Sequence, residues 1–122
     1  MTNTSENKFL SNLIIAKDIA NLAKDKKANN IIILDISKTS NFTDYFVICS
    51  ASSERQVSAI SKYIKNNIKK NNTITYNNME GLNRGQWVIG DFGDIIVHIF
   101  HDNKRLYYNI ESFWSTATKI DF

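Results

Sequence analysis

The side chains most suited to chemistry in this chain are four carboxylates, Glu80, Asp91, Asp94 and Glu111, which gather around one predicted hairpin. Nucleotide transfer would need two carboxylates two residues apart on one strand, to hold Mg²⁺ against a triphosphate. Two residues after Asp94 comes Ile96, and Asp91 and Asp94 are three residues apart across a turn. The spacing therefore lacks the metal-binding pair and argues against this reaction.

Cysteine and histidine suggest a thiol nucleophile or a zinc site. Cys49 lies in an apolar strand, where a cysteine is usually a small inert core residue. His98 and His101 are three residues apart at a strand end, with no further cysteine to complete four zinc ligands. The serines of SASSER, residues 50–55, start a helix and could cradle an anion, but no glycine lets the backbone approach it. We therefore predict no catalytic residue, no metal and no cofactor.

Composition fits one globular domain. The chain has 122 residues, of which 43% are hydrophobic and 22% charged, with a net charge of +3. A protein that wraps nucleic acid usually has a denser basic face. The single cysteine excludes an internal disulfide framework, and no apolar run approaches the roughly 20 residues that span a bilayer. Residues 1–8 lack the plan of a secretion signal, so we expect a cytoplasmic protein without a membrane partner.

Hydrophobic spacing predicts the elements that position these residues. The predicted helices and final turn cover residues 9–23, 53–70, 101–109 and 110–114. The predicted strands cover residues 31–36, 45–50, 73–76 and the two halves of the hairpin 85–100, with a loop at 77–84. This order predicts an α/β domain over residues 9–122, after a flexible N-terminus. Its mixed five-stranded sheet should carry helices mainly on one face.

The helix predicted at 53–70 is strongly amphipathic. Ser53 and Gln56 have the spacing of a capping box at its start. Ile60 and Ile64 lie on its apolar side and are predicted core residues. The segment 45–76 as a whole fits a right-handed crossover between parallel strands. On the other side of the helix lie Lys62, Lys65 and Lys69, which form either a solvated surface or a contact for RNA phosphates.

The hairpin GQWVIGDFGDIIVHIF, residues 85–100, is apolar on both faces. A turn at Phe92 and Gly93 would set Asp91 opposite Asp94, although a longer loop also fits, because Phe is awkward at the first turn position. Alternation then puts small aliphatic residues on one face, namely Val88, Gly90, Ile95, Val97 and Ile99. The other face, called the mixed face below, carries Trp87, Ile89, Asp91, Asp94, Ile96, His98 and Phe100.

The mixed face has two possible roles. The two long helices can cover one face of the sheet, so the mixed face is a candidate surface for a partner, with Trp87 as its anchor. Alternatively, the last segment folds back over it with its aromatic residues Tyr107, Tyr108, Phe113 and Trp114. An open apolar face could also pair with a second copy, so we expect a weak homodimer.

Four runs of residues resemble the ribosomal silencing factor family (RsfS, the Iojap family). They are DYFVI at 44–48, EG at 80–81, WVIGDFGDIIVHIF at 87–100 and YNIESFW at 108–114. The similarity covers roughly residues 9–114, and the hairpin block is its specific part. Gly90 departs from the family pattern, which more often has an aliphatic residue there, so thinner packing is expected at that position.

The resemblance implies a noncatalytic translation repressor that acts when nutrients are short. Such factors bind the large ribosomal subunit through ribosomal protein L-fourteen and block joining of the small subunit. The partner-binding residues would be Glu80, Trp87, Ile89, Asp91, Asp94, Ile96, His98 and Phe100. An acidic rim around an apolar centre suits a basic ribosomal protein, and the lysines of helix 53–70 could lie near ribosomal RNA.

The resemblance also implies a nucleotidyltransferase-like topology. A nucleotide-binding or nucleotidyl-transferring enzyme on the same fold therefore stays an alternative. A second alternative is an RNA-binding module that acts through helix 53–70.

Overall fold

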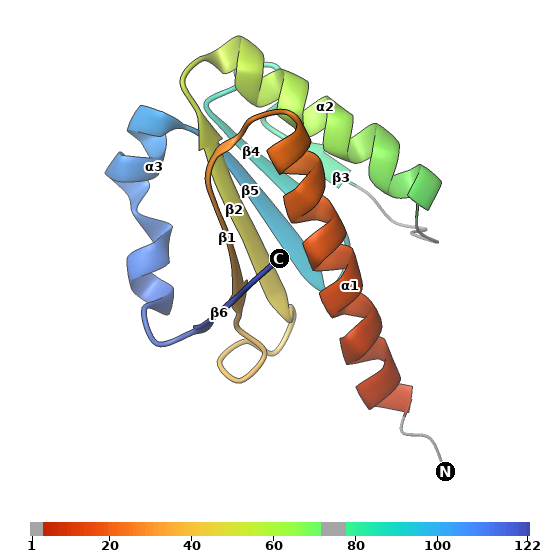
Figure 1. Ribbon diagram of the computed structural model, residues 1–122. Coiled ribbons are helices and arrows are strands. Elements are labelled where there is room, and N and C mark those ends of the chain that lie inside the picture. Colours follow the sequence, from red (N-terminus) through yellow and green to blue (C-terminus); the bar gives the residue numbers. More distant parts are fainter. Residues whose placement is uncertain (1–3, 72–77) are drawn as a thin grey trace.

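Two long helices lie on one face of a mixed sheet, and a short helical segment lies on the other (Figure 1). The computed structural model describes residues 4–71 and 78–122. The helical elements are α1 (Thr4–Asp25), α2 (Glu54–Asn71), α3 (Asp102–Tyr108) and the 3₁₀ turn η1 (Ile110–Trp114). The strands are β1 (Asn29–Asp35), β2 (Tyr45–Ala51), β3 (Asn78–Glu80), β4 (Trp87–Asp91), β5 (Ile95–His101) and β6 (Thr118–Ile120).

Within the described residues the sheet has six strands in the order β3-β4-β5-β2-β1-β6. Strands β2 and β5 pair in parallel, and the other pairs are antiparallel. The predicted α/β class and mixed sheet are confirmed, but the predicted number of five strands is wrong. Strand β3 lies in the predicted loop 77–84, and β6 was not predicted. The strand predicted at 73–76 lies outside the described residues.

The two added strands have only three residues each. A strand of three residues is too short to show a clear alternation of apolar and polar residues. It is stabilised by its backbone hydrogen bonds to the neighbouring strand more than by its own sequence. Strand β3 pairs with β4, and β6 pairs with β1 from Ile33 to Asp35. Both strands lie at the edges of the sheet.

The helix side of the sheet holds the larger core. Ile60 and Ile64 of α2 are fully buried there, as predicted, together with Ile19 of α1. The Ser53 hydroxyl accepts the Gln56 N–H at 3.1 Å, which is half of the predicted capping box. Helix α1 begins at Thr4, earlier than the predicted residue 9. No helix in the described residues has the length and apolar character needed to cross a membrane.

The hairpin confirms the predicted division of its strand residues between the two faces, but the predicted turn and the predicted place of Asp94 are wrong. Asp91 pairs with Ile96 instead of Asp94, and the N–H of Phe92 donates to the carbonyl of Ile95. The turn residues are therefore Gly93 and Asp94, with Gly93 at φ +83°. This register puts glycine where a positive φ is needed and buries Phe92 in the helix-side core.

The thinner packing expected at Gly90 is also absent. Gly90 is buried, and a Cβ at this position would lie 2.9 Å from Cε2 of Phe92 and 3.4 Å from Cε of Met79. The Phe92 ring folds back over the glycine, and Met79 of β3 packs beside it. The space that an aliphatic side chain would occupy is therefore filled by these two neighbours.

Candidate functional site

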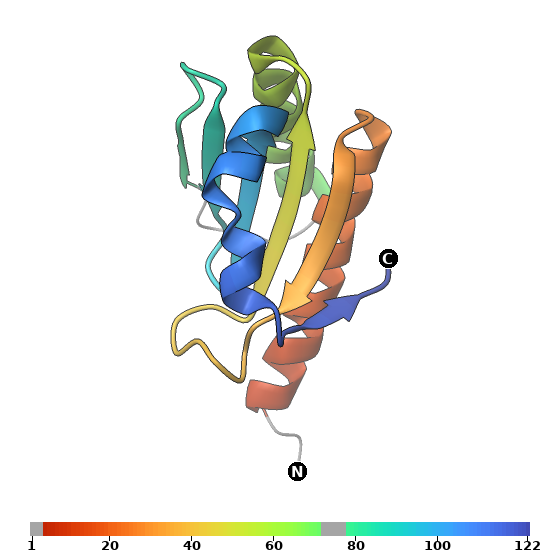
Figure 2. The same ribbon diagram turned by 90° about the vertical axis from the view of Figure 1, so that its left-hand side faces the viewer.

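The sheet face opposite α1 and α2 is divided into a covered part and an open part. Segment α3–η1 crosses this face over the central strands, as Figure 2 shows from the front. Ile110 and Trp114 of η1 pack onto a second core cluster formed mainly by β1, β2 and β5. The Trp114 ring meets Phe46 edge-on, with centroids 5.4 Å apart. The alternative that the last segment folds back is therefore correct for this part of the face.

The part toward β3 and β4 remains partly exposed. Ladder pairing places Glu80 beside Ile89, and Asp91 beside Ile96. Glu80 is exposed, and the side chains of Trp87, Ile89, Asp91 and Ile96 are partly buried. We call these five residues the open patch. It has an apolar centre and two carboxylates.

Two aromatic residues of the last segment lie in positions that sequence reasoning left undecided. Tyr108 packs against Trp87 with ring centroids 4.8 Å apart, and Tyr107 meets Tyr108 at 5.0 Å. Tyr107 is 78% exposed, so it does not cover the sheet. The tyrosines extend the aromatic surface of the open patch away from the sheet. The only signal in the sequence was their closeness to the hairpin in the chain.

His98 and Phe100, two predicted partner-binding residues, are buried beside Trp87. Phe100 is fully buried and stacks on Trp87 with centroids 4.9 Å apart. His98 is 7% exposed, and its Nδ1 accepts the Trp87 Nε1–H at 3.2 Å. Burial lowers the pKa of His98 to about 4, so the imidazole is neutral at pH 7. These two side chains support the surface instead of lining it.

Asp94, another predicted member of the site, is turned toward the helix layer. Its carboxylate accepts from Nδ2 of Asn12 on α1 at 3.1 Å, and the same amide donates to Asp44 at 3.2 Å. The backbone carbonyl of Asp94 also accepts the Thr43 hydroxyl at 2.8 Å. Asp94 therefore joins the hairpin turn to α1 and to the loop before β2. It is not part of the open patch.

Glu111, the fourth carboxylate of the predicted acidic rim, belongs to the covered part. It forms an ion pair with Arg105 at 2.7 Å. The Arg105 guanidinium also donates to the Ser50 hydroxyl at 3.1 Å and to the Asn29 carbonyl at 3.3 Å. Arg105 thus fastens α3 to the sheet, while Glu80 and Asp91 keep an acidic edge on the open patch.

The loop before Trp87 depends on Gly81. It has φ +92°, and a Cβ there would lie 2.2 Å from the backbone oxygen of Trp87. Only glycine permits this close approach. The Ser58 hydroxyl of α2 donates to the Leu82 carbonyl at 2.9 Å and fixes the same loop. The backbone of Trp87 is therefore held by a rigid connection to the helix layer.

The residues suited to other chemistry are not brought together. Cys49 is buried, and burial raises its pKa to about 12, so the thiol is inert. Among the described residues no three His, Cys, Asp or Glu side chains lie close enough to share a metal ion. On α2, Lys62 is exposed and Lys65 partly buried, while the side chain of Lys69 lies outside the described residues.

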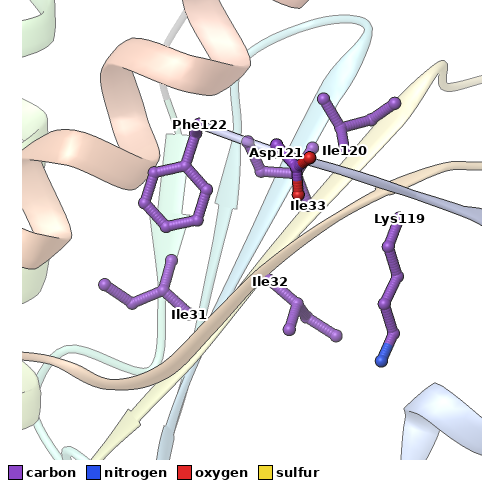
Figure 3. A pocket seen from close by; sticks show the side chains of 7 residues that line it. All are labelled: Ile31, Ile32, Ile33, Lys119, Ile120, Asp121 and Phe122. Carbon is purple, nitrogen blue, oxygen red and sulfur yellow. The ribbon is translucent and has the colours of Figure 1, made fainter.

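A hollow of about 390 Å³ lies at the other edge of the sheet, between β1 and the C-terminal strand. Its lining residues are Ile31, Ile32, Ile33, Lys119, Ile120, Asp121 and Phe122. Figure 3 shows mostly aliphatic side chains near the Phe122 ring, with Lys119 extending away from it. The hollow offers no set of catalytic groups and is separated from the open patch by the breadth of the sheet.

Known proteins resemble this chain in sequence and in fold. Residues 11–122 match the model of the family described as "Ribosomal silencing factor during starvation". The ribosomal silencing factor RsfS of Bacillus subtilis is 41% identical over 107 residues, which is 88% of this chain and 90% of that protein. A crystal structure from Chromobacterium violaceum has a TM-score of 0.81 at 31% identity and covers 90% of both chains. One from Bacillus halodurans has a TM-score of 0.74 at 33% identity, covering 93% of this chain and 99% of the other.

Proposed function

Because the chain belongs to the ribosomal silencing factor family, we propose that it represses translation without catalysis. It binds the large ribosomal subunit and blocks joining of the small subunit when nutrients are short. The observation that carries this proposal is the open patch, where a partly buried Trp87 lies among aliphatic side chains on a sheet face that α3–η1 covers incompletely. A factor that blocks by its bulk needs such a surface and no catalytic group.

The open patch has the properties of a protein interface. Tryptophan is among the residue types that most often dominate the binding energy of an interface. Ile89 and Ile96 supply apolar area beside Trp87. Glu80 and Asp91 give the patch an acidic edge on a chain whose net charge is +3. This charge distribution favours a basic partner. We propose that the partner is ribosomal protein L-fourteen.

Two further contacts belong to the proposal. The lysines Lys62, Lys65 and Lys69 on α2 would lie near ribosomal RNA, and the first two are accessible for this.

The open patch would also pair weakly with a second copy when the ribosome is absent. A protein mass that stays monomeric at every concentration in sedimentation equilibrium would exclude this dimer. The site of action is the cytoplasm, where the ribosomes assemble.

The two alternatives receive less support from the geometry. A nucleotidyl-transferring enzyme would need paired carboxylates, but Asp91 lies on the open patch while Asp94 bonds to α1. The nucleotidyltransferase-like topology stays a prediction. Saturable stabilisation by a nucleoside triphosphate with Mg²⁺ would favour the enzyme. Binding to naked RNA that survives physiological salt would favour an RNA-binding module.

The proposal is tested by sedimenting the purified protein with isolated large or small ribosomal subunits. We expect it to travel with the large subunit and to reduce the fraction of joined ribosomes when small subunits are added. Association with the small subunit alone, or binding to the large subunit without any effect on joining, would contradict the proposal.

A further inference from the structure

Among the described residues, the indole of Trp87 packs against two aromatic rings and donates a hydrogen bond to the imidazole of His98. Phe100 stacks against it at 4.9 Å with 26° between the ring planes, and Tyr108 lies at 4.8 Å. Contacts between ring faces allow one ring to slide and tilt on the other. The bond from Nε1–H to Nδ1 of His98, 3.2 Å long, is directional and sets where the N–H edge of the indole points. His98 therefore fixes the indole within its aromatic contacts.

The chemistry of His98 shows what this bond requires. Since Nδ1 accepts from Trp87, the proton of the neutral imidazole must be on Nε2. That Nε2 is fully buried and has no hydrogen-bond partner among the described residues. The imidazole otherwise touches rings, with Phe46 edge-on at 4.6 Å and Phe100 stacked at 6.2 Å.

The unpaired buried Nε2–H of His98 lowers the stability of the fold. An aliphatic or aromatic side chain would fill the same site without such a donor. What an apolar side chain cannot supply is an acceptor for the indole N–H. The histidine therefore stabilises the position of Trp87 more than it stabilises the fold.

We propose that His98 is a positioning residue, which fixes the Trp87 indole in the single orientation that the open patch presents to its partner. This inference rests on the proposed function. Ordering one free side chain at an interface costs about 0.5–1.5 kcal/mol, which corresponds to about threefold to tenfold in affinity. His98 does not contact the partner itself in this proposal. Its loss should still weaken binding by about this factor.

Two variants separate positioning from packing. His98→Leu fills the cavity without an acceptor. His98→Asn places an oxygen one bond beyond Cγ, where Nδ1 lies in histidine, and restores the acceptor. The first measurement follows solvent exchange of the two indole N–H signals by NMR in the free protein, assigned with Trp87→Phe. The signal of Trp114, which packs on Phe46, serves as the internal control.

We expect exchange at Trp87 to be about tenfold faster in His98→Leu, as the loss of one hydrogen bond implies, and to be restored in His98→Asn. Exchange at Trp114 should stay unchanged. The melting temperature of His98→Leu should stay within about 5 °C of that of the wild type. The substitution removes one stabilising hydrogen bond and, at the same time, one unpaired buried donor, and these two effects oppose each other. Unchanged exchange at Trp87 in His98→Leu would overturn the inference.

The second measurement is the affinity of each variant for isolated large ribosomal subunits. His98→Leu should bind about threefold to tenfold more weakly, and His98→Asn should recover most of this loss. If Trp87→Ala weakens binding and His98→Leu does not, the inference fails while the proposed function stands. If the wild type does not bind large subunits, the proposed function fails, and the exchange data alone decide whether His98 holds the indole.

Discussion

Asn12 of α1 and Asp94 of the hairpin turn, 82 residues apart in the chain, are joined by a hydrogen bond of 3.1 Å. The same amide donates to Asp44 at 3.2 Å, so one side chain separates two carboxylates that would otherwise repel each other. Asn12 is 8% exposed. The bond connects the helix layer with the end of the sheet where β2 and β5 begin.

Replacing Asn12 by alanine should therefore destabilise the domain. Hydrogen bonds to charged groups contribute about 1.5–3 kcal/mol, so we expect a loss of about 2 kcal/mol in the free energy of unfolding, measured by urea titration. Asn21→Ala is the control, because the exposed Asn21 bonds within its own helix, to the Lys17 carbonyl. Equal effects of the two substitutions would show that the link to the carboxylates is unimportant.

The packing of α2 on the sheet gives a second prediction. Ile64 is fully buried in the helix-side core. Ile64→Ala should lower the free energy of unfolding by about 2–5 kcal/mol, the usual cost of the cavity left by a large aliphatic side chain. Asn66→Ala, on the exposed side of the same helix, should change it by less than about 0.5 kcal/mol. A loss well below 1 kcal/mol for Ile64→Ala would mean that the helix packs differently.

These two positions show how far sequence reasoning extends. Ile64 was predictable because α2 repeats its apolar residues at helical spacing from Val57 to Ile68, over about three turns. The role of Asn12 was not, since a bond across 82 residues leaves no local pattern. For the same reason Asp94 was placed on the wrong layer. The alternation of the hairpin predicted the faces of its strand residues. It could not fix the turn, because moving the turn by one residue along the chain leaves those faces unchanged.

The exposure of the candidate site was predictable to a similar degree. The apolar pattern around Trp87 predicted a partly exposed surface, and five of the eight residues predicted to bind a partner lie on the open patch. Burial of Phe100 depends on where η1 lies, because Phe100 shares a core cluster with Ile110 and Trp114. That position is set by Trp114 on Phe46 and by Arg105 with Glu111, contacts between distant segments that no spacing rule predicts.

The depressed pKa of His98 makes stability depend on pH. Burial lowers this pKa from 6.5 to about 4, so the unfolded chain binds more protons than the folded one between these values. The stability from the neutral imidazole is thus fully present above about pH 6.5 and is lost as the pH falls toward 4. The difference in unfolding free energy between wild type and His98→Leu should shift against the wild type by about 2 kcal/mol from about pH 8 to about pH 5. If the difference in unfolding free energy between the two proteins is the same at both pH values, His98 is not buried in its neutral form.

The acidic edge of the open patch should control the rate of association. Glu80→Lys combined with Asp91→Asn removes both charges and adds a positive one. Asparagine keeps the acceptor that bonds the Gly93 N–H at 2.9 Å, so the turn should stay intact. Association with large subunits should be slower, and added salt should slow it less than it slows the wild type. Asp25→Lys, at the end of α1, is the control for a remote change of charge. If it slows association equally, the net charge matters and the patch does not.

Trp87 should be the anchor of the interface. Trp87→Ala should weaken binding to the large subunit by at least about 2 kcal/mol, or about thirtyfold, because truncation of a well-buried interfacial tryptophan commonly has this effect. Ile14→Ala is the matched control, since Ile14 is 60% exposed on the helix layer. Its affinity and its inhibition of subunit joining should equal those of the wild type. A melting curve for each variant separates binding from folding. If Trp87→Ala stays folded and still blocks joining at wild-type concentrations, the open patch is not the surface that meets the ribosome. If it unfolds, Trp87 is a core residue and the anchor must lie elsewhere on this face.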